Sequence, residues 1–432
     1  MAHSRALKIY SSIAFAAVTF AVLGTWQVSS TQSPWNDRPL SPMRTLTLHS
    51  GDCPVFPSAM AYSPDSAVLA VGTYRYERTC GVPTERASQL TLWDLATGEA
   101  ISTLFSDGAI PTRGKALNDG QQLLGNVVRD LAFDRSGQWA IAGLSDGTVR
   151  IWDRHTGHPL PTLEGHETAV QVLELSPRGH LLASGSSDGT IALWDLDGFR
   201  RIGTLAGRDT PVRTLRLFRH AARLMAQSVE GTTTLWDTDA AKPIRQFRGT
   251  RAVEVSPDGL TFAIATADNA IELRHSDRGT HIRTLSEHLE PIRAIAFSPD
   301  GTMLASSSED NTIHLWNVRT GAMVRTLSPV GMTRFHRSPI ADGAIAFSPD
   351  GTLLAASALM AGEPSNRPQP AVRLWEIKTG RQIETIEARS PFGFSPDGTR
   401  FVGVWGQALK VWQVRQTGET PSVSPLPGSE RR

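Results

Sequence analysis

Short runs of alternating apolar and polar residues, joined by tight turns, cover most of the chain. The unit at 169–195 shows the pattern most clearly, because one run alternates as a half-buried strand does and the next is small and apolar. The Pro and Gly at 176–179 suit a tight turn, and Asp188-Gly189 suits a two-residue hairpin. The strands of this unit are expected at 169–175, 181–185, 190–195 and 201–205. They predict a four-stranded antiparallel sheet.

The third of these strands ends in Trp-Asp, and this ending, intact or altered, recurs along the chain at intervals of roughly forty to sixty residues. The series consists of Trp93, Trp152, Trp194 and Trp236 before Asp, Trp316, Trp375 and Trp412 before other residues, and Arg274 in the remaining place. A repeat of this length ending in Trp-Asp is typical of one propeller blade. We therefore expect an all-β fold, a β-propeller of four-stranded antiparallel blades. It has eight blades, or seven if the unit around Arg274 is malformed.

The repeat resembles the WD-repeat family, and the resemblance covers residues 44–414. In that family a His, a Ser, an Asp in the hairpin and the Trp form a hydrogen-bonded group. Two units match it, with His166, Ser184, Asp188 and Trp194 in one and His288, Ser306, Asp310 and Trp316 in the other. Because the set recurs and an enzyme needs only one, we interpret it as structural rather than catalytic. The units around Trp236 and Arg274 depart most from the pattern, which is compatible with either drift or an adapted surface.

Closure of the ring accounts for the ends of the repeat region. The segment 44–49 has strand character but precedes the first complete unit. We expect it to pair as the outer strand of the last blade and so latch the ring, because pairing removes an exposed edge. Residues 415–432 are rich in Pro, Ser and Gly and are expected to form a disordered tail.

The amino terminus indicates a location. Arg5 and Lys8 precede an uncharged apolar run at 9–26, so residues 1–28 are expected to be either a signal peptide or a single transmembrane anchor. The positive charge before the run places the propeller outside the cytoplasm in both cases, membrane-anchored or exported to a periplasmic or extracellular space. Residues 29–43 are expected to be a flexible spacer.

Charge and cysteine content narrow the possible chemistry. The net charge of +1 argues against a nucleic-acid partner. Cys53 and Cys80 fall in connections that emerge on one face of the first blade, and an exported chain retains disulfides. We expect a Cys53–Cys80 bridge, with two free buried thiols as the alternative. The sequence supplies no set of ligands for a metal site, and no cofactor is expected.

Four long connections, 75–89, 106–126, 328–343 and 359–371, are predicted to emerge on one face over neighbouring blades. Functional residues concentrate on such loops, and Arg and Tyr are common anchors at protein interfaces. The candidate partner-binding residues are Tyr74, Arg75, Tyr76, Arg78, Arg113, Arg334, Phe335, His336 and Arg337, with Lys115 beside them. They are alternatively solvated residues of an Arg-rich chain.

Taken together, the sequence predicts a non-catalytic interaction platform that binds a protein partner through these loops. The membrane is a second partner if the amino-terminal segment is not cleaved. The alternatives are an extracytoplasmic propeller enzyme and a binder of an anionic envelope component. The platform is preferred because no nucleophile–base pair, phosphate-cradling glycine loop or metal cluster stands out in the sequence.

Overall fold

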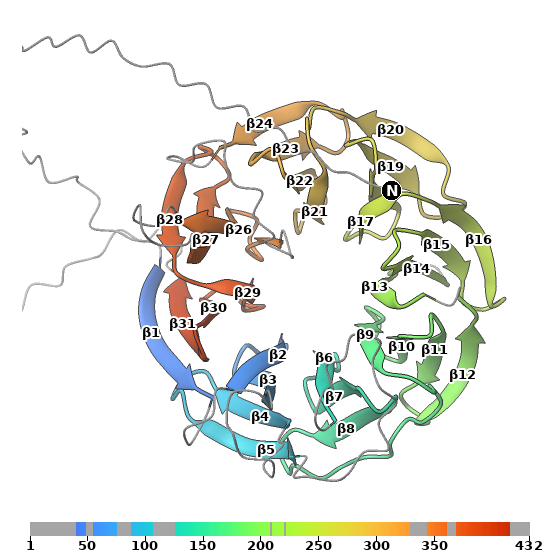
Figure 1. The fold of residues 1–432 in the computed structure, drawn as a ribbon, viewed down its shortest axis with the longest axis vertical. Helices are drawn as coiled ribbons and strands as arrows, with labels where there is room; N and C mark the ends of the chain where they lie inside the picture. The colour runs from blue at the N-terminus through green and yellow to red at the C-terminus, as the bar shows by residue number, and fades with distance from the viewer. Residues whose placement is uncertain are drawn as a thin grey trace, which may run out of the picture. The chain divides into compact units, whose positions relative to one another are not determined.

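A computed structural model describes residues 40–48, 55–75, 88–106, 126–207, 210–219, 222–328, 344–360 and 369–414. Residues Arg38–Arg432 form one compact unit, and the fold below is that of its described part. Its strands form eight antiparallel sheets arranged around an axis (Figure 1). The all-β, eight-bladed propeller expected from the repeat is confirmed.

The first four blades follow one another along the chain. Blade 1 consists of β2 (Val55–Tyr62), β3 (Val68–Arg75), β4 (Gln89–Asp94) and β5 (Ala100–Ser106). Blade 2 consists of β6 (Val128–Phe133), β7 (Trp139–Leu144) and β8 (Val149–Asp153). Blade 3 consists of β9 (Val170–Leu175), β10 (Leu181–Ser186), β11 (Ile191–Asp195) and β12 (Arg200–Leu205). Blade 4 consists of β13 (Val212–Leu217), β14 (Arg223–Ser228), β15 (Thr233–Asp237) and β16 (Lys242–Phe247).

The remaining blades complete the ring. Blade 5 consists of β17 (Thr250–Val255), β18 (Thr261–Thr266), β19 (Ile271–His275) and β20 (His281–Leu285). Blade 6 consists of β21 (Ile292–Phe297), β22 (Met303–Ser308), β23 (Ile313–Asn317) and β24 (Met323–Leu327). Blade 7 consists of β25 (Ile345–Phe347), β26 (Leu353–Met360), β27 (Gln369–Glu376) and β28 (Gln382–Ile386). Blade 8 consists of β29 (Arg389–Phe394), β30 (Arg400–Trp405), β31 (Ala408–Val414) and β1 (Leu40–Thr47).

Blade 2 has only three regular strands. The chain beside β8 makes isolated bridges instead of a ladder, from Val149 to Leu163 and from Trp152 to Pro159. Pro159 and Pro161 interrupt this stretch. Because proline has no N–H to donate, the outer strand cannot form a continuous ladder.

Blade 5 is complete although Arg274 stands where the other blades have Trp. The Arg274 Nε lies 2.8 Å from a Glu272 carboxylate oxygen, and its Nη1 donates to the Gly279 carbonyl oxygen over 2.8 Å. Its guanidinium lies 4.8 Å from the centre of the Phe247 ring on the outer strand of blade 4. Trp152 contacts Phe105 of blade 1 in the equivalent way. Arg274 therefore keeps the contact between blades, and the seven-bladed alternative is wrong.

The predicted latch is confirmed, because β1 pairs with β31 as the outer strand of blade 8. The strand begins at Leu40, earlier than the start at 44 expected from the sequence, and its register shifts between Pro42 and Arg44. Alternation of apolar residues could not reveal these first residues, since a bulge interrupts the two-residue period. Residues 40–43 thus belong to a strand rather than to the spacer.

Hydrogen bonds also join blade 8 to blade 1. The Arg400 Nη1 donates to the Ser66 carbonyl oxygen over 2.9 Å, and the Asp397 N–H donates to the Ser66 hydroxyl oxygen over 3.0 Å. The Tyr62 hydroxyl donates to the Gly393 carbonyl oxygen over 3.3 Å. These residues are far apart in sequence, so their contacts hold the ring closed.

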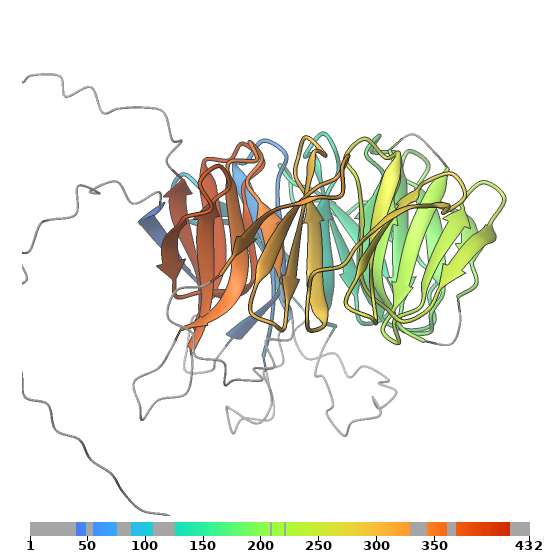
Figure 2. The same cartoon turned by 90° about the horizontal axis from the view of Figure 1, so that it is seen from above.

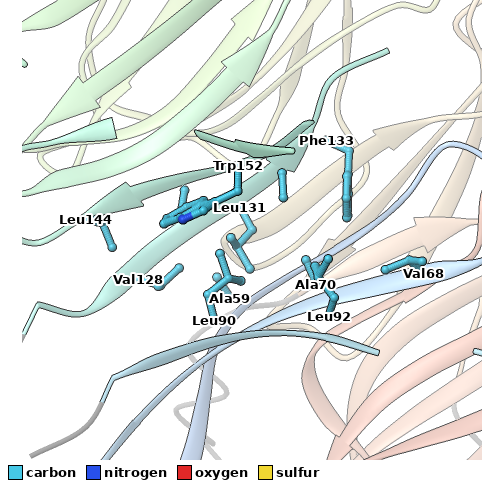
Figure 3. Packing of buried hydrophobic residues seen from close by; sticks show 12 residues of the cluster. Ala59, Val68, Ala70, Leu90, Leu92, Val128, Leu131, Phe133, Leu144 and Trp152 are labelled. Carbon is cyan, nitrogen blue, oxygen red and sulfur yellow. The ribbon is translucent and has the colours of Figure 1, made fainter. Parts of the chain in front are cut away.

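The hydrophobic core lies between the blades. In Figure 3, Leu90 of blade 1 lies near Val128 and Leu131 of blade 2, and Leu92 lies near Ala70. All of them belong to one cluster with Trp152. Small second-strand residues and large third-strand residues fill the space between neighbouring sheets. Each blade is therefore stabilised mainly by its two neighbours.

The antiparallel order gives the ring two different faces, which Figure 2 shows edge-on. We call the face at which each inner strand begins the start face. The second and outer strands of each blade end there, and the hairpins between second and third strands lie on it. Turns such as that between β17 and β18 lie on the opposite face.

Several sequence predictions lie outside the described residues: segments 1–28 and 29–39, Cys53, Cys80 and the tail 415–432. Within the described ranges, no helix has the length and apolar character needed to cross a membrane.

Candidate functional site

The first predicted hydrogen-bonded group forms in blade 3 with one extra member. The Ser184 hydroxyl lies 2.7 Å from His166 Nε2 and accepts the Trp194 Nε1–H over 2.8 Å. His166 Nδ1 contacts the Thr190 hydroxyl over 3.1 Å, and that hydroxyl donates to Asp188 over 2.6 Å. Thr190 therefore connects the His to the Asp, a role that the sequence did not reveal.

The second group, in blade 6, has the direct contact. His288 Nδ1 lies 2.8 Å from an Asp310 carboxylate oxygen, and His288 Nε2 lies 2.8 Å from the Ser306 hydroxyl. The same hydroxyl accepts the Trp316 Nε1–H over 2.9 Å. The His314 ring stacks on His288, with ring centres 4.0 Å apart.

Charges in this group are fixed by burial and hydrogen bonding. Burial acts to raise the pKa of Asp310, but hydrogen bonds from His288 and Thr312 outweigh it and hold that pKa well below its ordinary value. Burial, followed by the nearby charge of His288, lowers the pKa of His314 to about 4. His314 is therefore neutral at pH 7 and stacks as an uncharged ring.

Ser184 and Ser306 are fully buried, with 0% of their surface exposed. Each hydroxyl is already engaged by a His and a Trp, so a substrate cannot reach it. This geometry supports the structural interpretation of both groups.

Most of the predicted partner-binding residues cannot be placed. Tyr76, Arg78, Arg113, Lys115, Arg334, Phe335, His336 and Arg337 lie outside the described residues. Tyr74 is on β3, and its ring centre is 5.9 Å from that of Phe56 on the neighbouring strand. Arg75 is the last residue of β3.

The described strand ends show where the long connections leave the sheets. β3, β5, β24 and β26 end at the start face, and the strands that follow them begin there. Blades 7, 8, 1 and 2 are consecutive around the ring (Figure 1). These strand ends therefore cluster in one sector of the start face, which we call the loop sector.

An apolar pocket of about 520 Å³ lies in the loop sector, between blades 7 and 8. Its lining includes Pro370, Ala388, Val404 and Trp405. Trp405 ends β30 and is 41% exposed, whereas Trp412 in the repeat position is 5% exposed. An exposed Trp beside an apolar pocket is the side-chain arrangement found at the centre of many protein interfaces.

Neighbouring charges hold the Trp405 ring. The Lys410 ammonium lies 3.4 Å from the ring centre, and the Trp405 Nε1–H donates to a Glu387 carboxylate oxygen over 3.4 Å. The sequence analysis missed Trp405. The available signal was a Trp outside the repeat position, directly before the hairpin at Gly406.

Charged residues on consecutive inner strands also link neighbouring blades. Asp130 on β6 accepts the Leu173 N–H of blade 3 over 2.8 Å, and burial raises the pKa of Asp130 to about 6. Glu174 on β9 accepts the Leu217 N–H of blade 4 over 3.3 Å, and burial raises the pKa of Glu174 to about 7. Each carboxyl thus bridges one blade to the next.

The same line continues with an ion pair. Arg216 on β13 donates from Nε to both Glu254 carboxylate oxygens, over 3.1 and 3.2 Å. Arg216 Nη1 lies 3.9 Å from Glu174. The side chains of Glu174, Arg216 and Glu254 are 25%, 34% and 24% exposed, so water reaches them and the pair is not a dry core interaction.

Comparison with known proteins agrees with this architecture. A family model described as the WD domain, G-beta repeat (WD40), matches residues 120–153, 157–195 and 279–317. Together with the eight blades and the Trp-Asp repeat, these matches decide the family. The chain is a WD40-repeat β-propeller.

Curated WD40 relatives match only parts of the chain. CCR4-associated factor 4 of Saccharomyces cerevisiae is 35% identical over 97 residues, 21% of this chain and 15% of that protein. The nuclear distribution protein PAC1 of Mycosarcoma maydis is 40% identical over 57 residues, 13% of each chain. The guanine nucleotide-binding protein subunit beta of Zea mays is 31% identical over 138 residues, 32% of this chain and 30% of that protein. The matches thus span less than a third of each of these relatives.

The WD40 matches coincide with blades 2, 3 and 6. Blades 3 and 6 hold the two complete hydrogen-bonded groups, and both lie within matched ranges. WD40 propellers are usually non-catalytic scaffolds that bind other proteins. In the part of the chain that the structure describes, no cluster of three or more His, Cys, Asp or Glu is arranged to hold a metal ion.

Proposed function

We propose that this WD40 propeller is an interaction platform that docks a protein partner on the loop sector of the start face, with Trp405 as a central anchor. The observation that carries the proposal is the 41% exposed Trp405 ring at an apolar pocket of about 520 Å³. The contacts with Lys410 and Glu387 orient the ring before a partner arrives. The Trp405 side chain therefore loses little conformational entropy when a partner binds it.

The loop residues expected from the sequence supplement this anchor. Arg334, Phe335, His336 and Arg337 precede β25, and residues 76–87 follow β3, so both segments connect to strands in the loop sector. Arg and aromatic side chains are enriched among interface residues that carry most of the binding energy. We propose that they contribute to partner binding together with Trp405.

The test compares the intact chain with the Trp405→Ala and Leu260→Ala variants in quantitative pull-downs. Leu260 is a matched control, because it is apolar, 61% exposed and in a turn on the opposite face. Truncation of a central anchor costs 2 kcal/mol or more, which weakens binding by roughly thirtyfold. A partner retained by the Leu260 variant and lost by the Trp405 variant supports the proposal. A partner that both variants retain equally contradicts it.

We further propose that the propeller works outside the cytoplasm, tethered or exported by residues 1–28. The support is the sequence pattern of Arg5 and Lys8 before the apolar run. Protease added to cells whose outer envelope is opened but whose cytoplasmic membrane is intact should digest the propeller, and protection until that membrane is lysed would contradict this location. Peptide mapping without reductant tests the proposed Cys53–Cys80 bridge, which is absent if both thiols react with an alkylating reagent before reduction.

A further inference from the structure

Three arginines occupy the same place on successive inner strands, far from Trp405 on the start face. Arg213, Arg251 and Arg293 are each the second residue of β13, β17 and β21. The register with the second strand shifts at each of them, so each Arg sits on a β-bulge. A bulge re-aims the side chain that it carries. These strands are neighbours around the axis (Figure 1).

The bulges surround a pocket of about 280 Å³ on the start face of blades 4, 5 and 6. All three arginines line it, together with the hairpin that contains Glu230 and Gly231. Exposed Val229 lies at the edge, with 55% of its surface accessible. The pocket therefore combines guanidinium groups with one apolar contact.

Buried polar residues hold the base of the pocket. Thr250 is 4% exposed and its hydroxyl donates to the Gly231 carbonyl oxygen over 2.9 Å. Gln227 is 3% exposed and its amide donates to the Thr250 hydroxyl over 3.0 Å. A Cβ on Gly231, whose φ is +76°, would lie 2.6 Å from the Thr250 carbonyl oxygen, so glycine is required for this close approach. The hairpin is thus fixed against β17 before any ligand binds.

The charges of the pocket are not balanced. Arg293 pairs with Glu309 over 2.5 Å, but no ion pair joins Arg213 or Arg251 to any described residue. The Arg251 Nε is buried and has no hydrogen-bond partner within the described part of the chain. A buried donor without a partner is unfavourable, and a ligand acceptor would satisfy it. Among the residues that line the pocket, three arginines stand against a single carboxylate, that of Glu230, so positive charge is in excess.

We propose that Arg213, Arg251 and Arg293 form a binding site for a side-chain carboxylate of an acidic peptide segment on a partner protein. The excess of positive charge favours an anionic group. The planar guanidinium fork fits a carboxylate with two parallel hydrogen bonds. The pocket accommodates one such group, while the flanking peptide lies along the start face near Val229. The site is distinct from the Trp405 contact.

Isothermal titration of the full chain with a short synthetic peptide of Glu and Ser residues, blocked at both ends, tests this proposal. The same peptide with Gln in place of Glu is the ligand control. Arg251→Gln and Arg251→Lys are the test variants, and Arg278→Gln, an exposed site on the opposite face, is the matched control. Circular dichroism checks that each variant is folded.

The acidic peptide should bind, the Gln peptide should not, and added salt should weaken binding. Loss of a charge-assisted hydrogen bond should weaken binding at least tenfold in Arg251→Gln. Arg251→Lys should recover part of that loss, and Arg278→Gln should bind as the intact chain does. Trp405→Ala should also bind normally, which separates this site from the proposed docking surface.

Absence of peptide binding by the intact chain, or equal binding by Arg251→Gln, would overturn the proposal. Equal binding of the Gln peptide would show that charge is not recognised. Inorganic phosphate that binds more tightly than the peptide would identify a phosphate site instead and refute the carboxylate assignment.

Discussion

Replacing Ser306 with Ala should destabilise the propeller, because one hydroxyl serves two buried partners. Ser306 accepts the Trp316 Nε1–H over 2.9 Å and lies 2.8 Å from His288 Nε2. The Asp310 carboxylate accepts the N–H of His288 Nδ1. The substitution therefore leaves Trp316 Nε1 and His288 Nε2 buried without their shared partner.

The expected loss in the free energy of unfolding is about 2–4 kcal/mol, since each orphaned buried group costs about 1–3 kcal/mol. Urea denaturation measures this loss, and hydrogen exchange at β22 and β23 shows whether blade 6 opens locally, as repeat units can. Ser184→Ala in blade 3 removes the same two contacts and should cost a similar amount.

Ser286→Ala is the control, because Ser286 is exposed and adjoins the same blade. It should change stability by less than about 0.5 kcal/mol. If Ser306→Ala is as mild as this control, the hydrogen-bonded group does not stabilise the fold and the reasoning is refuted.

Two further substitutions test buried polar positions. Burial raises the pKa of Glu174 to about 7 from 4.5, so the folded state is stabilised below pH 4.5 and loses that stability as the pH rises through 7. Glu174→Gln should remove a loss of about 3 kcal/mol between pH 4 and 8 in urea titrations. A difference from the intact chain that does not vary with pH would contradict this. Trp236 Nε1 is buried without a partner among the described residues, and Ala226 occupies the register position that Ser184 has in blade 3. Ala226→Ser should therefore raise the urea midpoint, with a gain in the free energy of unfolding of about 0.5–1.5 kcal/mol. An unchanged or lower midpoint would show that the hydroxyl does not reach the indole.

The fold could be predicted in detail because the residues that determine each blade lie close together in sequence. Strand alternation, the Asp188-Gly189 hairpin and the Trp series each lie within one repeat, and the strands of blade 3 fall within a residue or so of their expected bounds. The latch was predictable because an unpaired edge requires a partner. The effect of Arg274 in the Trp position could not be predicted from the sequence, since the contact that replaces that of the Trp is made with Phe247 in the preceding blade.

The candidate sites were harder to predict because they depend on contacts between repeats. Arg213, Arg251 and Arg293 are unremarkable in a strand pattern, and only the bulges bring them to one pocket. Trp405 looks like another core Trp until its exposure is known. Sequence alternation reports which face of a strand is buried, not which side chains from separate blades converge.

The departure of blade 4 from the repeat now has a physical interpretation. Blade 4 has Ala226 in place of the serine that anchors the network in blades 3 and 6. In its place, Gln227 and Thr250 form buried hydrogen bonds that tie the hairpin at Gly231 to blade 5. Because neighbouring blades stabilise each other through the apolar core, one blade can lose the repeated network without losing its place in the ring. The altered hydrogen bonds then shape the arginine pocket, which favours an adapted surface over drift at this position.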